Sequence, residues 1–157
     1  MAHYWLMKSE PTSFSIDDLE KRPQQIEPWD GVRNYQARNF LQAMQVNDLA
    51  FFYHSSCPNP GIVGIIKIVK PAYTDKTAFD PSHHHYDPKS KADKPQWVCV
   101  DVKFTEKFTA TLRLDTLKKQ PSLTSMCLLQ KGNRLSVMPI TTEEWNTIIQ
   151  LVSAQCR

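Results

Sequence analysis

The sequence predicts an α+β fold: five to seven short strands in a small barrel, closed or partly closed, flanked by three or four short α-helices. The chain has 157 residues, a length that suits one domain over residues 1–157. Its apolar runs are short and follow one another with helical patterns between them, which is typical of α+β organisation. Closure into a barrel would hide the edges of such strands from solvent.

The first third of the chain predicts a strand followed by two helices. Pro11 ends the first apolar run, and Ser13 or Ser15 is placed to cap the helix that follows. Asp30-Gly31 is a turn dipeptide that precedes the second helical pattern. In order, we expect a strand at residues 4–7, a helix at 16–21, a connector at 24–28 and a helix from about 32 to 46.

The middle of the chain reads as strands around a long loop. Pro71 is expected to end a β-branched run, and the loop from 73 to 95 is rich in proline and Asp-Pro turns. Long loops in compact domains are usually functional or disordered, and the aromatic content of this one favours an ordered crossing. The expected strands are 49–53, 62–69 and 97–104, with 108–112 as an extension or a partner.

The last third predicts a helical turn, a hairpin and a helix. Thr141 or Thr142 is placed to cap the final helix, with two glutamates in its first turn. Its apolar face consists of Trp145, Ile148, Ile149 and Val152. Before it we expect a helical turn at 115–119 and a hairpin formed by residues 128–130 and 135–140.

Charge and cysteine spacing limit the class of protein. The formal net charge is +3 and the isoelectric point is near 8.7, which permits an anionic partner but falls short of a strong phosphate binder. No apolar segment approaches the roughly 20 residues of a membrane span, and the four cysteines contain no Cys-x-x-Cys pair. We expect a reduced intracellular monomer without a membrane partner, cytoplasmic, or nuclear if the source is eukaryotic.

Three enzymatic readings of the sequence are weak. Cys57 lies near His54, but nothing in the local sequence would lower the pKa of its thiol. The chain has only four glycines and no glycine-rich phosphate loop. His83, His84 and His85 are adjacent, and in an extended loop at most His83 and His85 share a side, which makes a poor zinc site. We therefore expect no enzyme, no cofactor and no metal, and interpret the histidines as the rim of a binding site.

Polar and aromatic residues gather where strands end or helices begin. In a small barrel such ends converge on one mouth, where they would supply an aromatic wall, hydroxyl and amide groups, and a cation. Those are the parts of a pocket for one extruded base. Trp29 could instead pack on the core, as most tryptophans do. The three clusters are Lys8-Ser9, the segment with Trp29, Arg33 and Asn34, and Tyr53-His54-Ser55.

Three ordered motifs resemble the signatures of the EVE domain family. They are Tyr4 to Pro11, Trp29 to Asn39 and Phe51 to Ser55, and the resemblance continues through Ala78 to Pro81, Tyr86 to Ser90, Trp97 to Val102 and the terminal helix. The resemblance implies a PUA-like fold, a β-barrel flanked by helices that is related to the YTH domains. It also implies recognition of modified nucleobases in DNA or RNA.

The resemblance assigns roles to individual residues. Ser9 corresponds to a serine that lines the pocket, and Trp29 to its wall. Tyr53, His54 and Ser55 lie at the strand end facing Trp29, and Trp97 is either a second aromatic wall or core. Relatives often carry serine and aromatic residues at the positions of His83, His84 and His85. The candidate ligand-binding residues are Lys8, Ser9, Trp29, Arg33, Asn34, Tyr53, His54, Ser55 and Trp97.

The leading hypothesis is non-enzymatic binding of a modified nucleobase, a modified pyrimidine, carried by DNA or RNA. One alternative is a general RNA-binding PUA-like module without selectivity for modification. A second alternative is a small nucleotide hydrolase, which would need an acid/base pair within hydrogen-bond reach.

Overall fold

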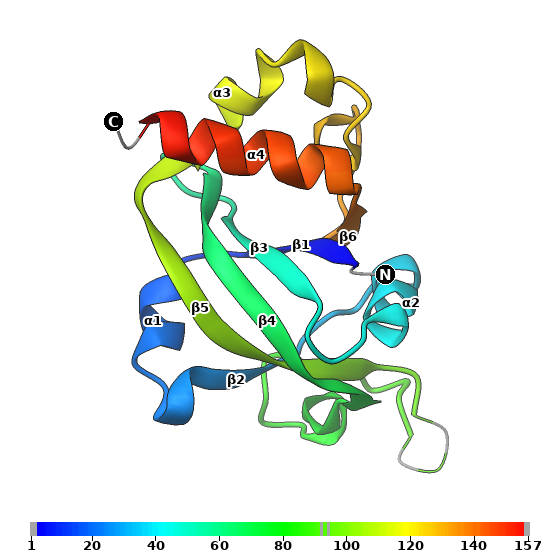
Figure 1. Cartoon of the computed structure of the whole chain (residues 1–157). Helices are drawn as coiled ribbons and strands as arrows, with labels where there is room; N and C mark the ends of the chain where they lie inside the picture. The colour runs from blue at the N-terminus through cyan, green and yellow to red at the C-terminus, as the bar shows by residue number, and fades with distance from the viewer. Residues whose placement is uncertain (1–2, 92, 94, 156–157) are drawn as a thin grey trace.

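Six strands form one mixed sheet in the computed structural model, which describes residues 3–91, 93 and 95–155. The strand order is β2-β5-β4-β3-β1-β6 (Figure 1). β1 runs parallel to β3, and the other neighbouring pairs are antiparallel. The predicted α+β class is confirmed, but within the described residues β2 and β6 are free edges and the sheet does not close. The strands are β1 (Tyr4–Ser9), β2 (Ile26–Trp29), β3 (Leu49–His54), β4 (Gly61–Thr74), β5 (Val98–Arg113) and β6 (Val137–Ile140).

Four α-helices surround the sheet in the described part of the chain: α1 (Ile16–Glu20), α2 (Tyr35–Ala43), α3 (Leu114–Lys118) and α4 (Thr142–Gln155). Helix α4 lies across one end of the long strands β4 and β5, with α3 beside it, while α1 and α2 lie toward the other end (Figure 1). Ser15 and Asp18 cap α1 by a reciprocal pair of hydrogen bonds. Thr141 and Glu144 do the same before α4. Both caps follow the capping-box pattern that marks a helix start in sequence. None of the helices in the described residues is long and apolar enough to cross a membrane.

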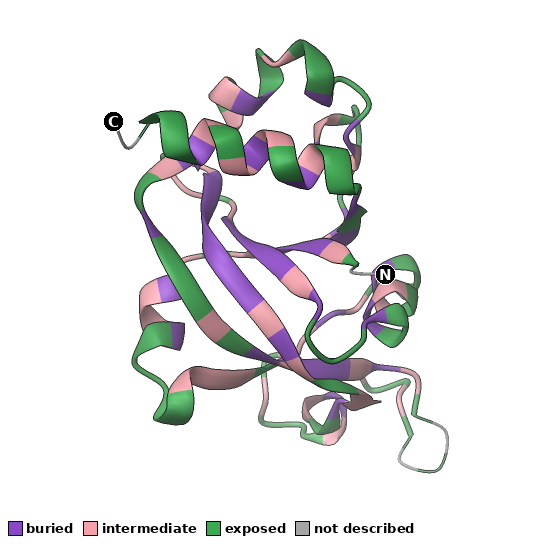
Figure 2. Cartoon of the chain, in the orientation of Figure 1, coloured by how far each residue is buried: buried purple, intermediate pink, exposed green. Residues whose placement is uncertain are grey.

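The core lies between the sheet and its helices. Purple, buried segments run along the strands and along one side of α4, whose other side is exposed (Figure 2). Trp145 of α4 stacks on Phe51 of β3 at 4.0 Å and on Tyr4 of β1 at 4.3 Å between ring centroids. Ile148 and Val152 are buried beside it. The apolar face predicted for the last helix therefore holds α4 to the sheet.

One strand was missed in the sequence, and it carries Trp29. Residues 26–28 belong to the expected connector at 24–28, but together with Trp29 they form β2 and pair with β5, with Trp29 opposite Val100. β2 is an edge strand, which tolerates Pro28 because one side of it needs no ladder partner. Helix α2 begins only at Tyr35, with Asn34 as its N-cap. Trp29 thus ends a strand instead of opening a helix.

The two longest strands exceed their predicted lengths. β4 continues through Pro71 to Thr74, and its register with β5 shifts between Lys70 and Tyr73. A bulge of this kind accommodates a proline, which has no N–H to donate. β5 is continuous from Val98 to Arg113, so the two expected strands are one.

The predicted final hairpin is wrong. Residues 127–129 form a 3₁₀ turn, and β6 pairs with β1, with Val137 opposite Met7. β1 is thereby held between β3 and β6. The long crossing between β4 and β5 contains one 3₁₀ turn, Lys76–Phe79, followed by a series of turns.

Candidate functional site

A cavity of about 350 Å³ opens where the ends of β1 and β2 approach the loop between β4 and β5. This volume lies at the small end of the range for ligand pockets, roughly 300–1,000 Å³. The cavity therefore suits one small ligand group. It is lined by residues 8–10, 13–14, 22, 27–32, 83–85 and 136.

Trp29 forms an aromatic wall of the cavity. Its side chain is largely buried, with perpendicular contacts to Phe52 at 5.2 Å and to Phe14 at 6.3 Å between centroids. Neither ring stacks in parallel on the indole. The indole N–H has no hydrogen-bond partner among the described residues. Trp29 therefore brings to the cavity lining an aromatic ring on which neither phenylalanine stacks in parallel, and a free N–H donor.

Ser9 ends β1 with its hydroxyl at the cavity. The hydroxyl donates to the carbonyl oxygen of Phe14 at 2.7 Å. Because that bond uses its only hydrogen, the oxygen can only accept from a ligand. The backbone carbonyl oxygen of Ser9 accepts a hydrogen bond from the backbone N–H of Ser55 at 3.0 Å. This bond joins the ends of β1 and β3.

Charged groups of both signs line the cavity. Burial lowers the pKa of Lys8, whose Nζ lies 5.7 Å from the centre of the Tyr53 ring. Arg22 forms an ion pair with Glu27. Glu10 and Asp30 complete the set, so that three carboxylates face two cations. This balance favours a ligand with donor groups over a bare phosphate.

Asp30 lies between the wall of the cavity and its rim. Burial, and next the nearby charge of Asp75, raise the pKa of its carboxyl group. Its Oδ1 lies 3.6 Å from Nδ1 of His85, beyond the usual hydrogen-bond length. The carboxylate is thus near the imidazole without a direct bond to it.

Arg33 and Asp75 fix the segment after Trp29 to the long loop. Asp75 is 1% exposed and accepts hydrogen bonds from the Gly31 N–H and from Arg33 Nη1, each at 2.9 Å. Burial alone would raise the pKa of Asp75, but hydrogen bonds from Thr77, Gly31 and Arg33 lower it overall. Arg33 also donates to the carbonyl oxygen of His85 at 2.8 and 3.1 Å. One guanidinium therefore holds both sides of the cavity rim.

Gly31 allows the rim to close. Its φ is +80°, a conformation that favours glycine. A Cβ at this position would lie 2.4–2.6 Å from atoms of the His85 ring. Only a residue without a side chain lets the imidazole pack on the backbone here.

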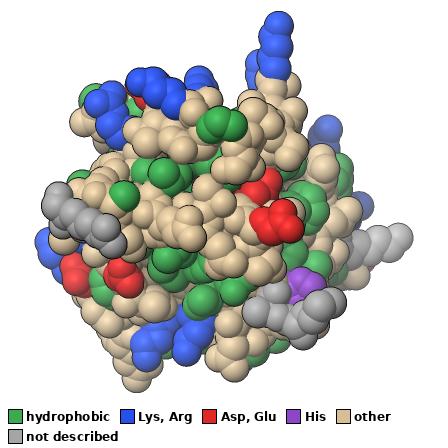
Figure 3. All heavy atoms as spheres, turned by 45° about the horizontal axis from the view of Figure 1, so that its top comes forward, with side chains coloured by type: hydrophobic (Ala, Val, Ile, Leu, Met, Phe, Trp, Pro, Cys, Tyr) green, Lys and Arg blue, Asp and Glu red, His purple; other side chains and the backbone are tan. Residues whose placement is uncertain are grey.

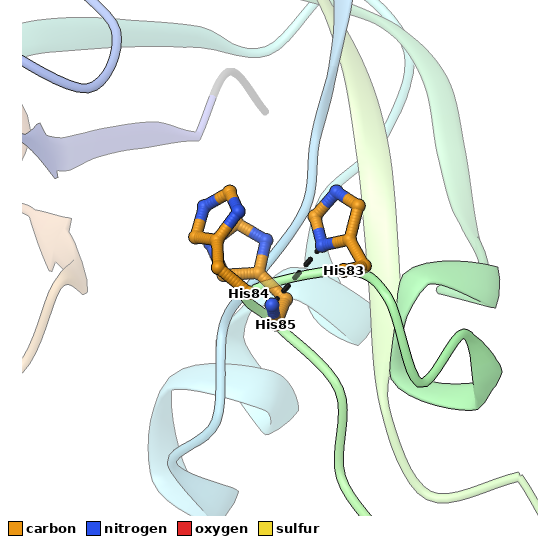
Figure 4. Close-up of side chains that lie close together, drawn as sticks. All are labelled: His83, His84 and His85. Atoms are coloured by element: carbon orange, nitrogen blue, oxygen red, sulfur yellow. Dashed lines mark hydrogen bonds between the residues drawn. The ribbon is translucent and has the colours of Figure 1, made fainter.

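The three histidines adopt an arrangement that the sequence analysis excluded. Residues 81–85 form turns instead of an extended strand, and one ring nitrogen of each histidine lies within 4.8 Å of the other two. The expectation that at most His83 and His85 share a side is therefore wrong (Figure 4). All three line the cavity, as the rim interpretation proposed.

Of the nine predicted ligand-binding residues, the cavity lining brings together Lys8, Ser9 and Trp29. Asn34 instead caps α2, accepting from the Ala37 N–H at 2.9 Å. His54 accepts from the Ile16 N–H at 3.1 Å. For the described residues, the lining includes none of Arg33, Asn34, Tyr53, His54, Ser55 or Trp97.

Trp97 lies outside the cavity in a different aromatic cluster. Its ring stacks on Tyr35 at 4.9 Å between centroids, and its Nε1 donates to Asp87 at 2.6 Å. The Arg33 guanidinium lies 5.7 Å from its centre. Trp97 does not line this cavity, and its role as a second wall of the pocket stays a prediction.

Several residues of the cavity lining were not predicted from the sequence, among them Phe14, Glu27 and Ser136. Phe14 and Ser136 give no local signal, because the fold alone brings the start of α1 and the segment before β6 to the end of β1. Glu27 was not predicted because it lies in β2, the strand that the sequence did not reveal.

An aromatic cavity at the strand ends of a mixed sheet defines a small α+β ligand-binding domain. The chain belongs to the EVE domain family, whose model matches residues 3–151. It is 50% identical to thymocyte nuclear protein 1 of Mus musculus, covering 96% of this chain and 74% of that protein. The predicted family membership is confirmed.

Solved structures agree with this assignment. A protein from Pseudomonas putida superposes with a TM-score of 0.92 at 54% identity, covering 95% of this chain and 99% of that one. The human protein THYN1 superposes with a TM-score of 0.92 at 45% identity, covering 96% and 98% of the two chains. That human structure is a complex with DNA containing 5-methylcytosine.

Proposed function

We propose that this protein binds a modified pyrimidine of a nucleic acid in the cavity beside Trp29, without catalysing a reaction. The observation that carries the proposal is the largely buried indole of Trp29, which lines the cavity with an unpartnered N–H. The complex of human THYN1 with DNA containing 5-methylcytosine supports it.

The cavity offers groups for the face and the edge of a base. An extruded base gains about 1–3 kcal/mol from stacking on an aromatic side chain. The exocyclic amino group of cytosine donates hydrogen bonds, which carboxylates accept, and Glu27 and Asp30 supply carboxylates in the lining. Ser9 adds an acceptor, and Trp29 adds a donor. These groups favour an amino-bearing base over a phosphate.

The sugar-phosphate chain would remain outside the cavity and make few contacts. On the face shown in Figure 3 the lysine and arginine side chains form small separate groups and no continuous basic patch. Together with a net charge of +3, this predicts a shallow dependence of affinity on salt, with a log–log slope of about −2 to −4. A general RNA-binding module would need a more continuous basic surface.

Location and assembly belong to the same proposal. We infer a nuclear location if the source is eukaryotic, in agreement with the name thymocyte nuclear protein 1 of the vertebrate relatives. A cytoplasmic location in a bacterium and a monomeric state stay predictions.

The decisive experiment compares two oligonucleotides of one sequence, with and without 5-methylcytosine, in single- and double-stranded form. Ser9→Ala is the test variant and Ser55→Ala its matched control, because Ser55 lies beside Ser9 but outside the cavity lining. We expect tighter binding of the modified oligonucleotide. Ser9→Ala should weaken it by about 0.5–1.5 kcal/mol, and Ser55→Ala should leave it unchanged.

Two results would contradict the proposal. Equal affinity for both oligonucleotides, with a salt slope near about −8, would indicate general nucleic-acid binding. Equal losses in Ser9→Ala and Ser55→Ala would show that the cavity is not where the base binds.

A further inference from the structure

The histidine cluster at the cavity rim offers chemistry that recognition of a base does not use. The centroids of the His84 and His85 rings lie 3.8 Å apart, and those of His83 and His84 lie 4.7 Å apart. Figure 4 shows the three side chains projecting from one turn toward the same side. Three consecutive residues thus present three ring nitrogens within 4.8 Å of one another.

The backbone of this turn is fixed by contacts outside the imidazole rings. His83 donates its N–H to the carbonyl oxygen of Asp80, and Tyr86 donates to the carbonyl oxygen of His83. Arg33 holds the carbonyl oxygen of His85 from the other side. The backbone that carries the three side chains is therefore held in place before any ligand arrives, which lowers the entropic cost of binding.

One ring nitrogen of His83 and one of His85 have defined surroundings. Nδ1 of His83 accepts the His85 N–H at 3.0 Å, so this nitrogen carries a lone pair, which a metal would take over from that hydrogen bond. Nδ1 of His85 is buried without a hydrogen-bond partner. A buried polar atom without a partner is unfavourable, and the carboxylate of Asp30 is near enough to supply one.

Asp30 completes the arrangement. A histidine that binds a metal almost always donates its other ring N–H to a carboxylate or a carbonyl oxygen. Asp30 Oδ1 lies 3.6 Å from His85 Nδ1, so a small movement would make this bond and leave His85 Nε2 for the metal. The carboxylates of Asp30, Glu10 and Glu27 in the lining would also offset the charge of a dication.

We propose that His83, His84 and His85 bind one zinc-like divalent metal ion at the rim of the cavity, with Asp30 orienting His85. Three histidine ligands with a fourth position open to solvent or to a ligand are an established zinc arrangement. Zinc–nitrogen distances of about 2.0–2.1 Å require the three nitrogens to approach one another further. The exposed His84 ring has room to do so, and His83 exchanges its hydrogen bond from His85 for the metal. The open position would face the cavity, which all three residues line.

The test uses the full chain without an affinity tag, stripped of metal by a chelator, and titrated with Zn²⁺ by calorimetry and with Co²⁺ by visible absorption. We expect one equivalent to bind, with a dissociation constant in the micromolar range or tighter. His84→Asn should weaken binding at least tenfold, because His84 is exposed and its replacement spares the fold. His3→Asn is the matched control, since His3 is exposed and lies outside the cluster.

Asp30→Asn tests the orienting role and should weaken binding several-fold while keeping one equivalent. Unchanged affinity in Asp30→Asn would overturn that role. The metal site itself would be overturned if no stoichiometric binding occurs, or if His84→Asn and His3→Asn bind alike. No nucleic acid is present in the titration, so its outcome is independent of base recognition.

Discussion

Trp29 and Trp97 are two tryptophans with nearly equal burial, 7% and 6% exposed, and different surroundings. Trp97 is fully engaged by the protein: it stacks on Tyr35, donates to Asp87 and lies under the Arg33 guanidinium. Trp29 makes perpendicular contacts and has no hydrogen-bond partner among the described residues. Burial therefore does not distinguish the two tryptophans, whereas their contacts do, and only Trp29 keeps groups free for the proposed ligand.

The cluster around Trp97 should be the more sensitive to loss of charge. Arg33→Ala leaves the buried Asp75 without its ionic partner, and breaking a buried pair costs about 3–5 kcal/mol. The free energy of unfolding, measured by denaturant titration, should decrease by an amount near the lower end of that range, because the Arg33 side chain is 23% exposed. Arg38→Ala is the control, since Arg38 also lies over an aromatic ring, that of Tyr35, but without a buried partner. Equal losses in the two variants would refute the role given to Arg33.

The packing of the His85 ring at the cavity rim depends on Gly31. Gly31→Ala adds the cost of a left-handed backbone, about 1–2 kcal/mol, to a clash with the His85 ring. Gly132→Ala is a matched control, because Gly132 has nearly the same φ, +79°, and nothing within 4 Å of an added Cβ. The melting temperature should fall further in Gly31→Ala. Equal decreases would show that the His85 ring moves aside without cost.

Trp97→Phe should reduce stability while sparing ligand binding. It removes the N–H that donates to the Asp87 carboxylate, and with it a hydrogen bond that holds the long loop to the start of β5. The melting temperature should decrease, and the affinity for a modified oligonucleotide should not. A loss of affinity at an unchanged melting temperature would make Trp97 a second wall of the pocket.

Stability should also fall in mild acid. Burial lowers the pKa of His54, and burial followed by the charges of His84 and His83 lowers that of His85 to about 4. Below their ordinary pKa of 6.5 these rings take up protons in the unfolded chain before they do so in the folded one. The free energy of unfolding should therefore have its largest value above about pH 7 and decrease as the pH falls toward 5. His54→Gln should reduce the decrease, and a flat profile would contradict the burial of both rings.

Local signals in the sequence predict part of the fold and part of the site. Capping residues and periodic apolar faces located α1 and α4. The end of the first strand located Lys8 and Ser9, and the family motif that was expected to open a helix located Trp29. Strand β2 was missed because it is four residues long, contains Pro28 and depends on pairing with β5. The hairpin was wrong because β6 pairs with β1 at the other end of the chain. The histidine cluster escaped prediction because its turn is held by Arg33, a contact between distant segments.

We propose that Trp29, and not Trp97, binds the base. The direct test is the affinity for an oligonucleotide containing 5-methylcytosine, measured for Trp29→Ala and Trp97→Ala at a temperature where circular dichroism shows both to be folded. Trp29→Phe, which keeps a ring against Phe14 and Phe52 but removes the N–H, serves if the alanine variant unfolds. We predict that Trp29→Ala weakens binding by about 1–3 kcal/mol, roughly 5- to 150-fold, and that Trp97→Ala changes it less than about twofold. Wild-type affinity in the Trp29 variants, or an equal loss in both positions, would contradict the account.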